Sequence, residues 1–205
     1  MLDGRFAQKR QKMNTYSYLI ETENLILRPF QNSDINSMIK NWISDPEIQK
    51  NYGEPVYSEI EMISELINKW NIEIENNNKF RWNILCKIDG ESIGQIGVCH
   101  FDKDNNCIDI EYCIGKMYQN RGYATESVIA GIDYIFNNTK IERIQAFHRG
   151  KNAMSGKVLK NAGMFFEGIH RNAYRYTETG LYDDKVWYGI IKSDYDARRP
   201  TTGST

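Results

Sequence analysis

The sequence of 205 residues lacks the cysteine and histidine patterns that mark metal-binding and disulfide-rich proteins. It contains four cysteines and three histidines, and no two cysteines form a C-x-x-C pair. The cysteines fall in runs with the character of β-strands. We therefore expect reduced, mostly packed cysteines and no metal site, because zinc sites and disulfide frameworks use recognisable ligand spacings.

The chain also lacks a strong net charge and any long apolar run. Its 26 Lys and Arg residues balance 27 Asp and Glu residues, which leaves a formal net charge of −1. This balance gives no basic field of the kind that nucleic-acid-binding proteins use. No apolar run approaches the ~20 residues of a membrane-spanning helix, and the basic N-terminus lacks the apolar segment of a signal peptide. We expect a cytoplasmic protein that binds neither nucleic acid nor membrane.

Two well-known phosphate-binding loops are missing as well. There is no G-x-x-x-x-G-K-[ST] segment and no G-x-G-x-x-G segment after the first expected strand. These motifs place backbone N–H groups around phosphates in P-loop and Rossmann proteins. Their absence argues against a nucleotide triphosphatase and a Rossmann oxidoreductase.

What the sequence does contain is an alternation of strand-like and helix-like segments. Asp89-Gly90 between two apolar runs predicts a β-hairpin, Pro46 marks the end of the first helix, and Ser58 with Glu61 predicts a capping box for the second. The pattern indicates one mixed α/β domain over 16–192, with an antiparallel first half and a β–α–β crossover in the second. Residues 1–15 are expected to be a flexible extension and 193–205 a polar tail. Strands are expected at 25–30, 80–88, 92–101, 107–115 and 141–148, followed by a closing antiparallel pair, and helices at 32–46, 58–75, 122–137 and 152–163.

The segment YQNRGYATESV, from Tyr118 to Val128, joins an expected strand to an expected helix. The start of a helix has unpaired backbone N–H groups and favours negative charge. Gly122 and Ala124 would let a phosphate approach that backbone, and Thr125 adds a hydroxyl. The segment alone is equally compatible with a diphosphate site and with a tight turn that binds nothing.

The same segment resembles the GNAT superfamily of acetyl-CoA-dependent N-acetyltransferases. The family signature [QR]-x-x-G-x-[GA] corresponds to Gln119, Gly122 and Ala124. TENLILRPF, WISDPEIQKNYG, IDIEYCIGKMYQNRGYATE, NAMSGKVLKNAGMFFEG and GLYDDKVWYGII are similar to the branch that contains ribosomal-protein N-terminal (alanine/serine) acetyltransferases. The resemblance covers about residues 17–192. It implies an α/β GNAT fold, with a mixed, mostly antiparallel twisted sheet of about seven strands, flanked by four helices and splayed between its fourth and fifth strands.

The resemblance implies acetyl-CoA as co-substrate and no metal. In the family the loop backbone binds the diphosphate, and the fourth strand, here near Cys113 and Ile114, binds the pantetheine and polarises the thioester carbonyl. Asn152 matches a family asparagine that holds the pantetheine, although Asn also suits a helix N-cap. The expected diphosphate residues are Gln119, Asn120, Arg121, Gly122, Tyr123, Ala124 and Thr125.

For acid–base chemistry the sequence offers Glu111 and Ser155. Glu111, on the fourth strand, is the candidate base for the amine, and an exposed strand carboxylate without a catalytic role is the alternative. Ser155 matches the position where some relatives are thought to use a serine, for cofactor binding or proton donation. Many relatives place a tyrosine acid directly after the helix leucine, but here Lys160 follows Leu159. Tyr174 and Tyr176 are further candidates.

The expected acceptor is a primary amine, with a protein N-terminus favoured by the resemblance. Trp42, Tyr52, Trp82 and Tyr182 are candidate pocket residues, although each such side chain is individually more often part of a core. Polyamines, amino acids and aminoglycosides remain open as acceptors, as does an acetyl-CoA-binding module without turnover. The sequence does not decide between a monomer and a homodimer.

Overall fold

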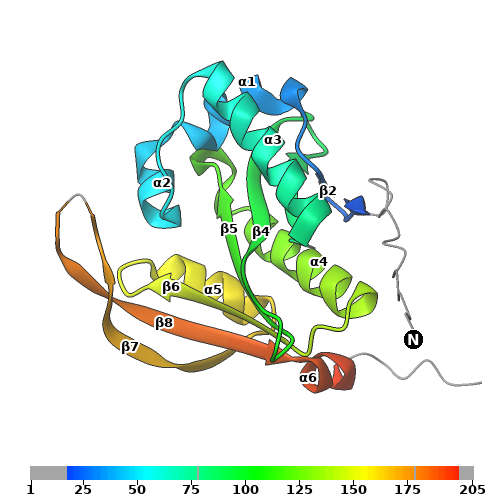
Figure 1. Cartoon of the computed structure of the whole chain (residues 1–205), viewed down its shortest axis with the longest axis vertical. Helices are drawn as coiled ribbons and strands as arrows, with labels where there is room; N and C mark the ends of the chain where they lie inside the picture. The colour runs from blue at the N-terminus through cyan, green and yellow to red at the C-terminus, as the bar shows by residue number, and fades with distance from the viewer. Residues whose placement is uncertain (1–17, 78, 178, 199–205) are drawn as a thin grey trace, which may run out of the picture.

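The structure is a computed structural model that describes residues 18–77, 79–177 and 179–198 (Figure 1). The described residues form a single sheet of eight strands in the order β1-β2-β3-β4-β5-β6-β8-β7. The strands are β1 (Ile20–Glu21), β2 (Leu25–Arg28), β3 (Arg81–Cys86), β4 (Ser92–Asp102), β5 (Cys107–Ile114), β6 (Arg143–Arg149), β7 (Phe165–Arg175) and β8 (Tyr182–Ile191). The helices are α1 (Ile35–Met38), α2 (Pro46–Tyr52), α3 (Ile60–Asn77), α4 (Tyr123–Asn138), α5 (Ala153–Asn161) and α6 (Lys192–Ala197).

This architecture confirms the predicted mixed, mostly antiparallel α/β fold. Only β5 and β6 pair in parallel, through the crossover helix α4, and the other neighbouring strands described are antiparallel. The counts exceed the expected seven strands and four helices, because the described residues also include the two-residue strand β1 and several short helices. The expected extension 1–15 lies outside the described residues.

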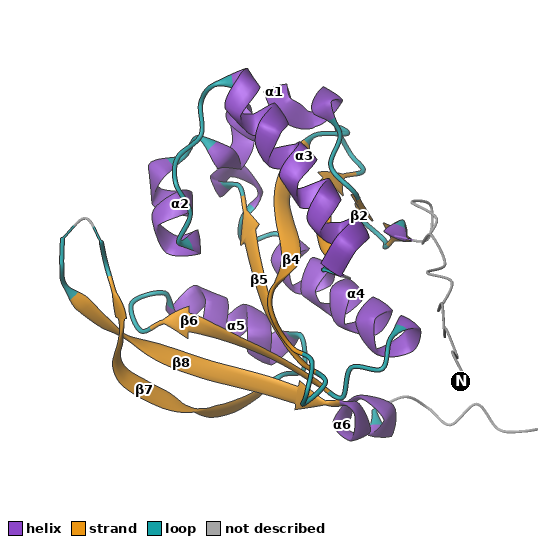
Figure 2. Ribbon diagram, in the orientation of Figure 1, coloured by secondary structure: helices purple, strands orange, loops and turns teal. Residues whose placement is uncertain are grey.

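The sheet opens between β5 and β6, as predicted. Their pairing covers only Cys107–Asp109 on β5 and Arg143–Gln145 on β6. Beyond these residues the two strands diverge, so that β5 rises toward α1 while β6 turns toward the β7–β8 hairpin (Figure 2). The divergence leaves the C-terminal half of β5 without a partner strand on its β6 side.

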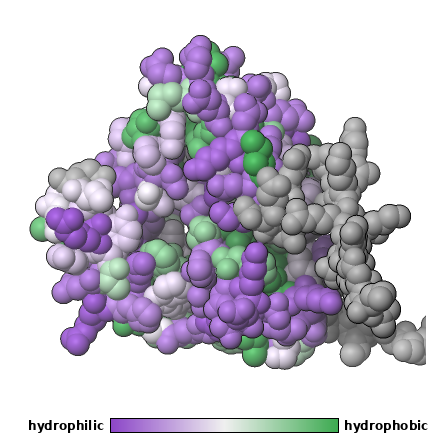
Figure 3. Space-filling model, viewed as in Figure 1, coloured by the Kyte–Doolittle hydropathy of each residue, from purple (hydrophilic) through white to green (hydrophobic). Residues whose placement is uncertain are grey.

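Two hydrophobic cores lie on opposite faces of the sheet. One packs α4 and α5 against residues such as Ile108, Ile110 and Ile144. The other packs α1, α2 and α3 around Trp42, and it includes Cys113 from β5. The visible surface over the α1–α3 layer is largely hydrophilic (Figure 3), as expected for helices that bury one apolar face.

The predicted helix 32–46 is helical as far as Ile43, but a second helix that was not predicted begins at Pro46. The chain forms a 3-10 turn (Asn32–Asp34), α1 and a π-helical turn (Ile39–Ile43), and then breaks. Asp45 caps a new helix by accepting hydrogen bonds from the N–H groups of Glu47 (2.9 Å) and Ile48 (3.3 Å). Pro46 occupies the first turn of α2, where a missing N–H costs nothing. Pro46 therefore follows the end of the first helical segment and also begins α2.

Two further boundaries differ from expectation. The helix α3 begins at Ile60, and the Ser58 hydroxyl donates to Glu59 (3.2 Å), so the predicted capping box is wrong. Residues expected to start the polar tail form α6, because Tyr195 is buried against Phe136 with ring centroids 5.0 Å apart. Within the described ranges, none of the helices combines the length and apolar character needed to cross a bilayer.

Candidate active site

The loop between β5 and α4 exposes its backbone at the helix start. Asn120 and Gly122 have positive φ angles of 60° and 84°. The N–H of Glu126 donates to the carbonyl of Gly122 (2.9 Å), which closes the first turn. The N–H groups of residues 123–125 precede this bond and have no acceptor within their own helix. This geometry fits a phosphate, because Gly122 is exposed and a Cβ there would meet no described atom within 4 Å.

The side chains of this loop mostly hold it in place. The Gln119 amide donates to the Ile114 carbonyl (3.0 Å), which ties the loop to the end of β5. Tyr123 is 5% exposed and belongs to the core, so only its backbone N–H can face a ligand. Arg121 is exposed, and its guanidinium lies 5.6 Å from the centre of the Tyr118 ring.

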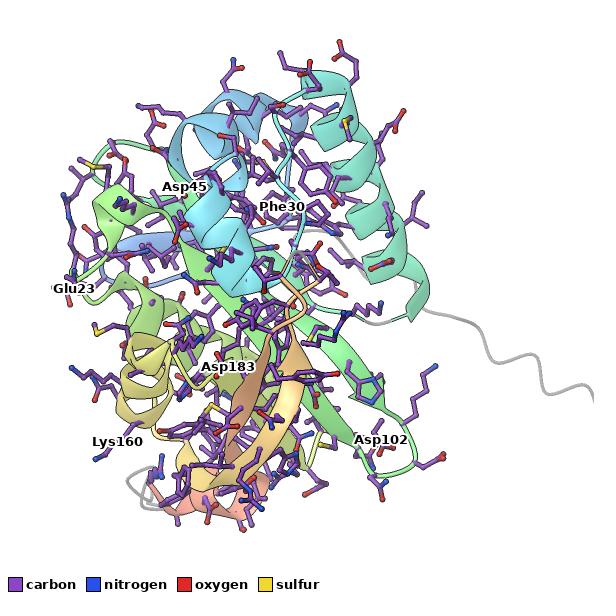
Figure 4. The ribbon with its side chains drawn as sticks, turned by 90° about the vertical axis from the view of Figure 1, so that its left-hand side faces the viewer. Glu23, Phe30, Asp45, Asp102, Lys160 and Asp183 are labelled. Carbon is purple, nitrogen blue, oxygen red and sulfur yellow. The ribbon has the colours of Figure 1, made fainter. Side chains whose placement is uncertain are left out.

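A pocket of about 190 Å³ lies where β5 and β6 diverge. It draws on the end of α2 and the turn after it, the strands β4, β5, β6 and β7, and the start of α5. Figure 4 looks onto this side, with Asp45 marking the start of α2 above and Asp183 marking β8 below. The lining residues are Asn51, Tyr52, Gly53, Glu54, Cys99, Asp109, Ile110, Glu111, Tyr112, Phe147, His148, Arg149, Asn152, Ser155 and Tyr174.

Glu111 is held in a network of charged and polar groups. Its Oε1 accepts hydrogen bonds from the Tyr52 hydroxyl (2.6 Å) and from Arg81 Nη2 (2.9 Å). Arg81 also donates to Gln95 Oε1 (2.7 Å). Burial raises the pKa of Tyr52 well above its usual value, and Glu111 adds to this while Arg81 opposes it. Tyr52 therefore stays protonated and donates.

The two other carboxylates of the pocket differ in their partners. Asp109 Oδ1 accepts a hydrogen bond from the Gln145 amide (2.7 Å). Glu54 follows α2 and forms no hydrogen bond or ion pair through its carboxylate within the described part of the chain. Burial raises the pKa of Glu54, and the charge of Glu111 raises it further.

The start of α5 presents two polar side chains to the pocket. Asn152 occupies the N-cap position, but its side chain makes no capping hydrogen bond, so the purely structural alternative for this residue is not supported. Ser155 lies one turn later, and its carbonyl accepts a hydrogen bond from the Tyr112 hydroxyl (2.9 Å). Both residues line the pocket, and their side-chain polar groups remain available to a ligand.

Some predicted residues do not reach the pocket. Trp42 and Trp82 are each 1% exposed, and their indole N–H groups donate to Ser92 (3.2 Å) and to the Tyr18 carbonyl (2.8 Å). Both are core residues, which corrects their expected role. Tyr182 is 58% exposed and does not line the pocket, whereas Tyr52 and Tyr174 do.

The sequence reasoning missed several lining residues, including Glu54, Phe147 and Arg149. The guanidinium of Arg149 stacks 4.0 Å from the Tyr174 ring centre and donates to the Lys50 carbonyl, so it joins β6 to α2 across the opening. Gly53, directly after α2, was the one local signal of a turn before Glu54. Nothing in the sequence indicated that this turn would lie beside β5.

A family model described as an acetyltransferase (GNAT) domain matches residues 24–165. The chain belongs to the GNAT acetyltransferase family. It is therefore an acetyl-CoA-dependent N-acetyltransferase, and the resemblance noted in the sequence is confirmed. The uncharacterized N-acetyltransferase p20 of Bacillus licheniformis is 28% identical to this GNAT protein over 174 residues, which cover 85% of this chain and 96% of that protein.

Solved structures of GNAT enzymes share the fold at lower identity. The ribosomal-protein-S5-alanine acetyltransferase from Vibrio fischeri matches with a TM-score of 0.74 and 20% identity, covering 89% of this chain and 99% of that one. The spermidine N-acetyltransferase from Vibrio cholerae, solved with CoA and spermine, matches with a TM-score of 0.72 and 20% identity, covering 85% and 99%. These enzymes act on different acceptors, so the likeness leaves the acceptor class open.

Proposed function

We propose that this GNAT protein acetylates the α-amino group at the N-terminus of a polypeptide. The proposal rests on the proton acceptors of the pocket at the opening of the sheet. Most of them are carboxylates, namely those of Glu54, Asp109 and Glu111. A carboxylate is a weak base. An α-ammonium group of pKa about 8 is about 3 kcal/mol easier to deprotonate than an alkyl ammonium of pKa about 10.4, because each pKa unit costs about 1.4 kcal/mol.

Acetyl-CoA, the second substrate, supplies the activated acetyl group. We propose that the backbone N–H groups of residues 122–125 hold its diphosphate, and that the N–H groups near Cys113 and Ile114 face its thioester carbonyl. The unpaired edge of β5 beyond Asp109 supports this assignment, because an extended chain can pair with it. Asn152 and Ser155 would donate hydrogen bonds to the pantetheine and the sulfur from the start of α5.

Glu111 has a different role in this proposal from the one expected of it. Protonating Glu111 at either oxygen would remove the negative charge that strengthens the hydrogen bonds from Tyr52 and Arg81 to Oε1. We propose that Glu111 orients these two groups and adds negative charge that attracts an ammonium group. Its role as the base is the competing hypothesis, and the variants described below separate the two.

A small cationic amine is the second candidate acceptor. The grouping of Glu54, Asp109 and Glu111 in one pocket would also attract a polyamine, and one of the similar structures is a spermidine acetyltransferase. A free amino acid or an aminoglycoside would likewise bring an ammonium group to these carboxylates.

The test is CoA release from acetyl-CoA with a panel of amines. The panel contains peptides with free N-termini, the same peptides with blocked N-termini and one lysine, spermidine, amino acids and aminoglycosides. We expect turnover with free N-termini and little with blocked peptides. Turnover with spermidine but not with peptides would select the second candidate. Acetyl-CoA binding without turnover on any amine would indicate a silent binding module.

A further inference from the structure

The three carboxylates of the pocket are not equally available to a substrate. Asp109 is engaged by Gln145, and Glu111 by Tyr52 and Arg81. Glu54 is the carboxylate in the described pocket that receives no hydrogen bond and no ion pair. Protonation of Glu54 therefore breaks no hydrogen bond or ion pair of the described residues, whereas Asp109 and Glu111 each accept hydrogen bonds that favour their ionised form.

The backbone holds Glu54 at a fixed place on the rim of the pocket. Gly53 ends α2 with φ 92°, and its N–H donates to the Gln49 carbonyl (2.7 Å). The N–H of Glu54 donates to the same carbonyl (3.2 Å). Gly53 also packs against Arg149, because an added Cβ would lie 2.8 Å from Nη2 of that residue. The turn is therefore fixed both by α2 and by β6.

The surroundings of Glu54 favour proton uptake. Glu54 is exposed at the rim of the pocket, but partial burial of its carboxyl raises the pKa, Glu111 raises it further, and Arg81 and Lys69 lower it, with a net increase. A base is most effective when its pKa approaches the working pH. The other titratable or charged groups that line the same pocket are Tyr52, Cys99, Asp109, Tyr112, His148, Arg149 and Tyr174.

The histidine of the pocket is a less suitable base. His148 is 8% exposed, and its Nδ1 lies 2.7 Å from the Arg149 carbonyl, so Nδ1 carries the proton and donates. Its Nε2 packs against α5, where a Cβ on Gly156 would lie only 2.6 Å away. The close approach of Gly156 and the burial of the ring restrict the access of a substrate amine to Nε2.

We propose that Glu54 is the catalytic base of this enzyme and accepts a proton from the acceptor ammonium, directly or through one water. This proposal rests on the proposed function. The ammonium gives one proton to Glu54, and the freed nitrogen lone pair forms the C–N bond to the acetyl carbon. The C–S bond breaks and its electron pair leaves with sulfur. The nitrogen then loses its second proton, the CoA thiolate takes up one proton, and Glu54 returns its proton to solvent.

The experiment compares Glu54→Gln, Glu54→Asp and Glu111→Gln over pH 5.5–9.5 with a peptide acceptor. Glu47→Gln is the matched control, because Glu47 is exposed on α2, the helix that precedes Glu54, and does not line the pocket. We expect kcat of Glu54→Gln to fall about 10²-fold at pH 7, the usual scale for a lost base. The loss should shrink toward pH 9.5, where the amine is already neutral, and Glu54→Asp should recover part of the rate.

Glu111→Gln provides the second readout. Removal of the negative neighbour should lower the pKa of Glu54, so the acidic limb of the rate profile should move to lower pH but persist. In Glu54→Gln the limb set by this carboxylate should disappear, which leaves only the rise in rate that follows the ionisation of the acceptor amine, while calorimetry should give an unchanged Kd for acetyl-CoA.

Two results would overturn the proposal. One is a Glu54→Gln enzyme with the wild-type rate and pH profile. The other is loss of the acidic limb in Glu111→Gln with its retention in Glu54→Gln, which would make Glu111 the base. Either outcome leaves acetyl transfer by the wild-type enzyme intact, whereas failure of the wild type with every amine would refute the proposed function itself.

Discussion

The substitution Gly122→Val tests the diphosphate site in the loop before α4. Gly122 has φ 84°, a conformation that a valine adopts only with strain, and a Cβ there would contact no described atom within 4 Å. The substitution should therefore lower the free energy of unfolding mainly through backbone strain, by about 1–3 kcal/mol. For a protein of this size, about 2 kcal/mol lowers Tm by roughly 4–8 °C.

The effect on acetyl-CoA binding should be larger than strain alone explains. A hydrogen bond from a backbone N–H to a charged group contributes about 1.5–3 kcal/mol. A valine side chain occupying the open space at Gly122 should displace one or two of these bonds from the phosphates. The loss of about 3 kcal/mol corresponds to a roughly 100-fold weaker Kd.

Gly180→Val is the matched control for strain. Gly180 has φ 70° in the β7–β8 hairpin, and the nearest described atom to its added Cβ is the flexible end of Arg175 at 3.3 Å. Both variants should lose similar stability in thermal melts, but only Gly122→Val should lose affinity in calorimetry with acetyl-CoA. Equal affinities for the two variants, or a wild-type Kd for Gly122→Val, would refute the diphosphate site.

Three further variants test the pocket. Asn152→Ala should weaken acetyl-CoA binding about tenfold, the size expected for one lost hydrogen bond, with an unchanged Tm because its side chain caps nothing; a lower Tm with an unaltered Kd would show that Asn152 is structural. Arg81→Met should lower the free energy of unfolding, measured in urea, by about 2 kcal/mol. This is less than the ~3–5 kcal/mol expected for breaking a fully buried ion pair, because the side chains of Arg81 and Glu111 are 12% and 22% exposed. Unchanged stability would mean that water fully replaces the ion pair. Ser155→Ala should lower kcat less than tenfold, since a thiol of pKa ~8.5 leaves readily as its anion; a 10²-fold loss would instead make Ser155 an essential acid.

Most strands and long helices could be predicted because their signals are local. The Asp89-Gly90 hairpin formed as expected, with the Gly90 N–H donating to the Cys86 carbonyl (2.8 Å). The helix α2 could not be recognised, because Pro46 was interpreted only as a stop. Asp45 directly before it was the missed signal, since Asp at the N-cap and Pro at the next position together favour a helix start.

The site was less predictable than the fold, because its contacts join distant segments. Glu111 was found from its place on a strand, but its partners lie 59 residues away at Tyr52 and 30 residues away at Arg81. Trp82, in contrast, was wrongly predicted to line the pocket. Its aromatic side chain suited a substrate pocket by type, yet its indole N–H found a backbone carbonyl inside the core. Residue type alone does not decide between these outcomes.

The strand β5 shows how one alternating pattern specifies both core and site. Ile108 and Ile110 face the α4–α5 core, while Asp109 and Glu111 point to the opposite face, on which Cys113 is covered by the α1–α3 layer. The two carboxylates fall where that layer ends and where β6 has begun to diverge. A slip of one residue would put isoleucine side chains in the places of Asp109 and Glu111 and a carboxylate in the core, so the packing of the sheet fixes the register. The same pattern makes the α2 side of the opening acidic, and we therefore expect the acceptor amine to reach the thioester from that side.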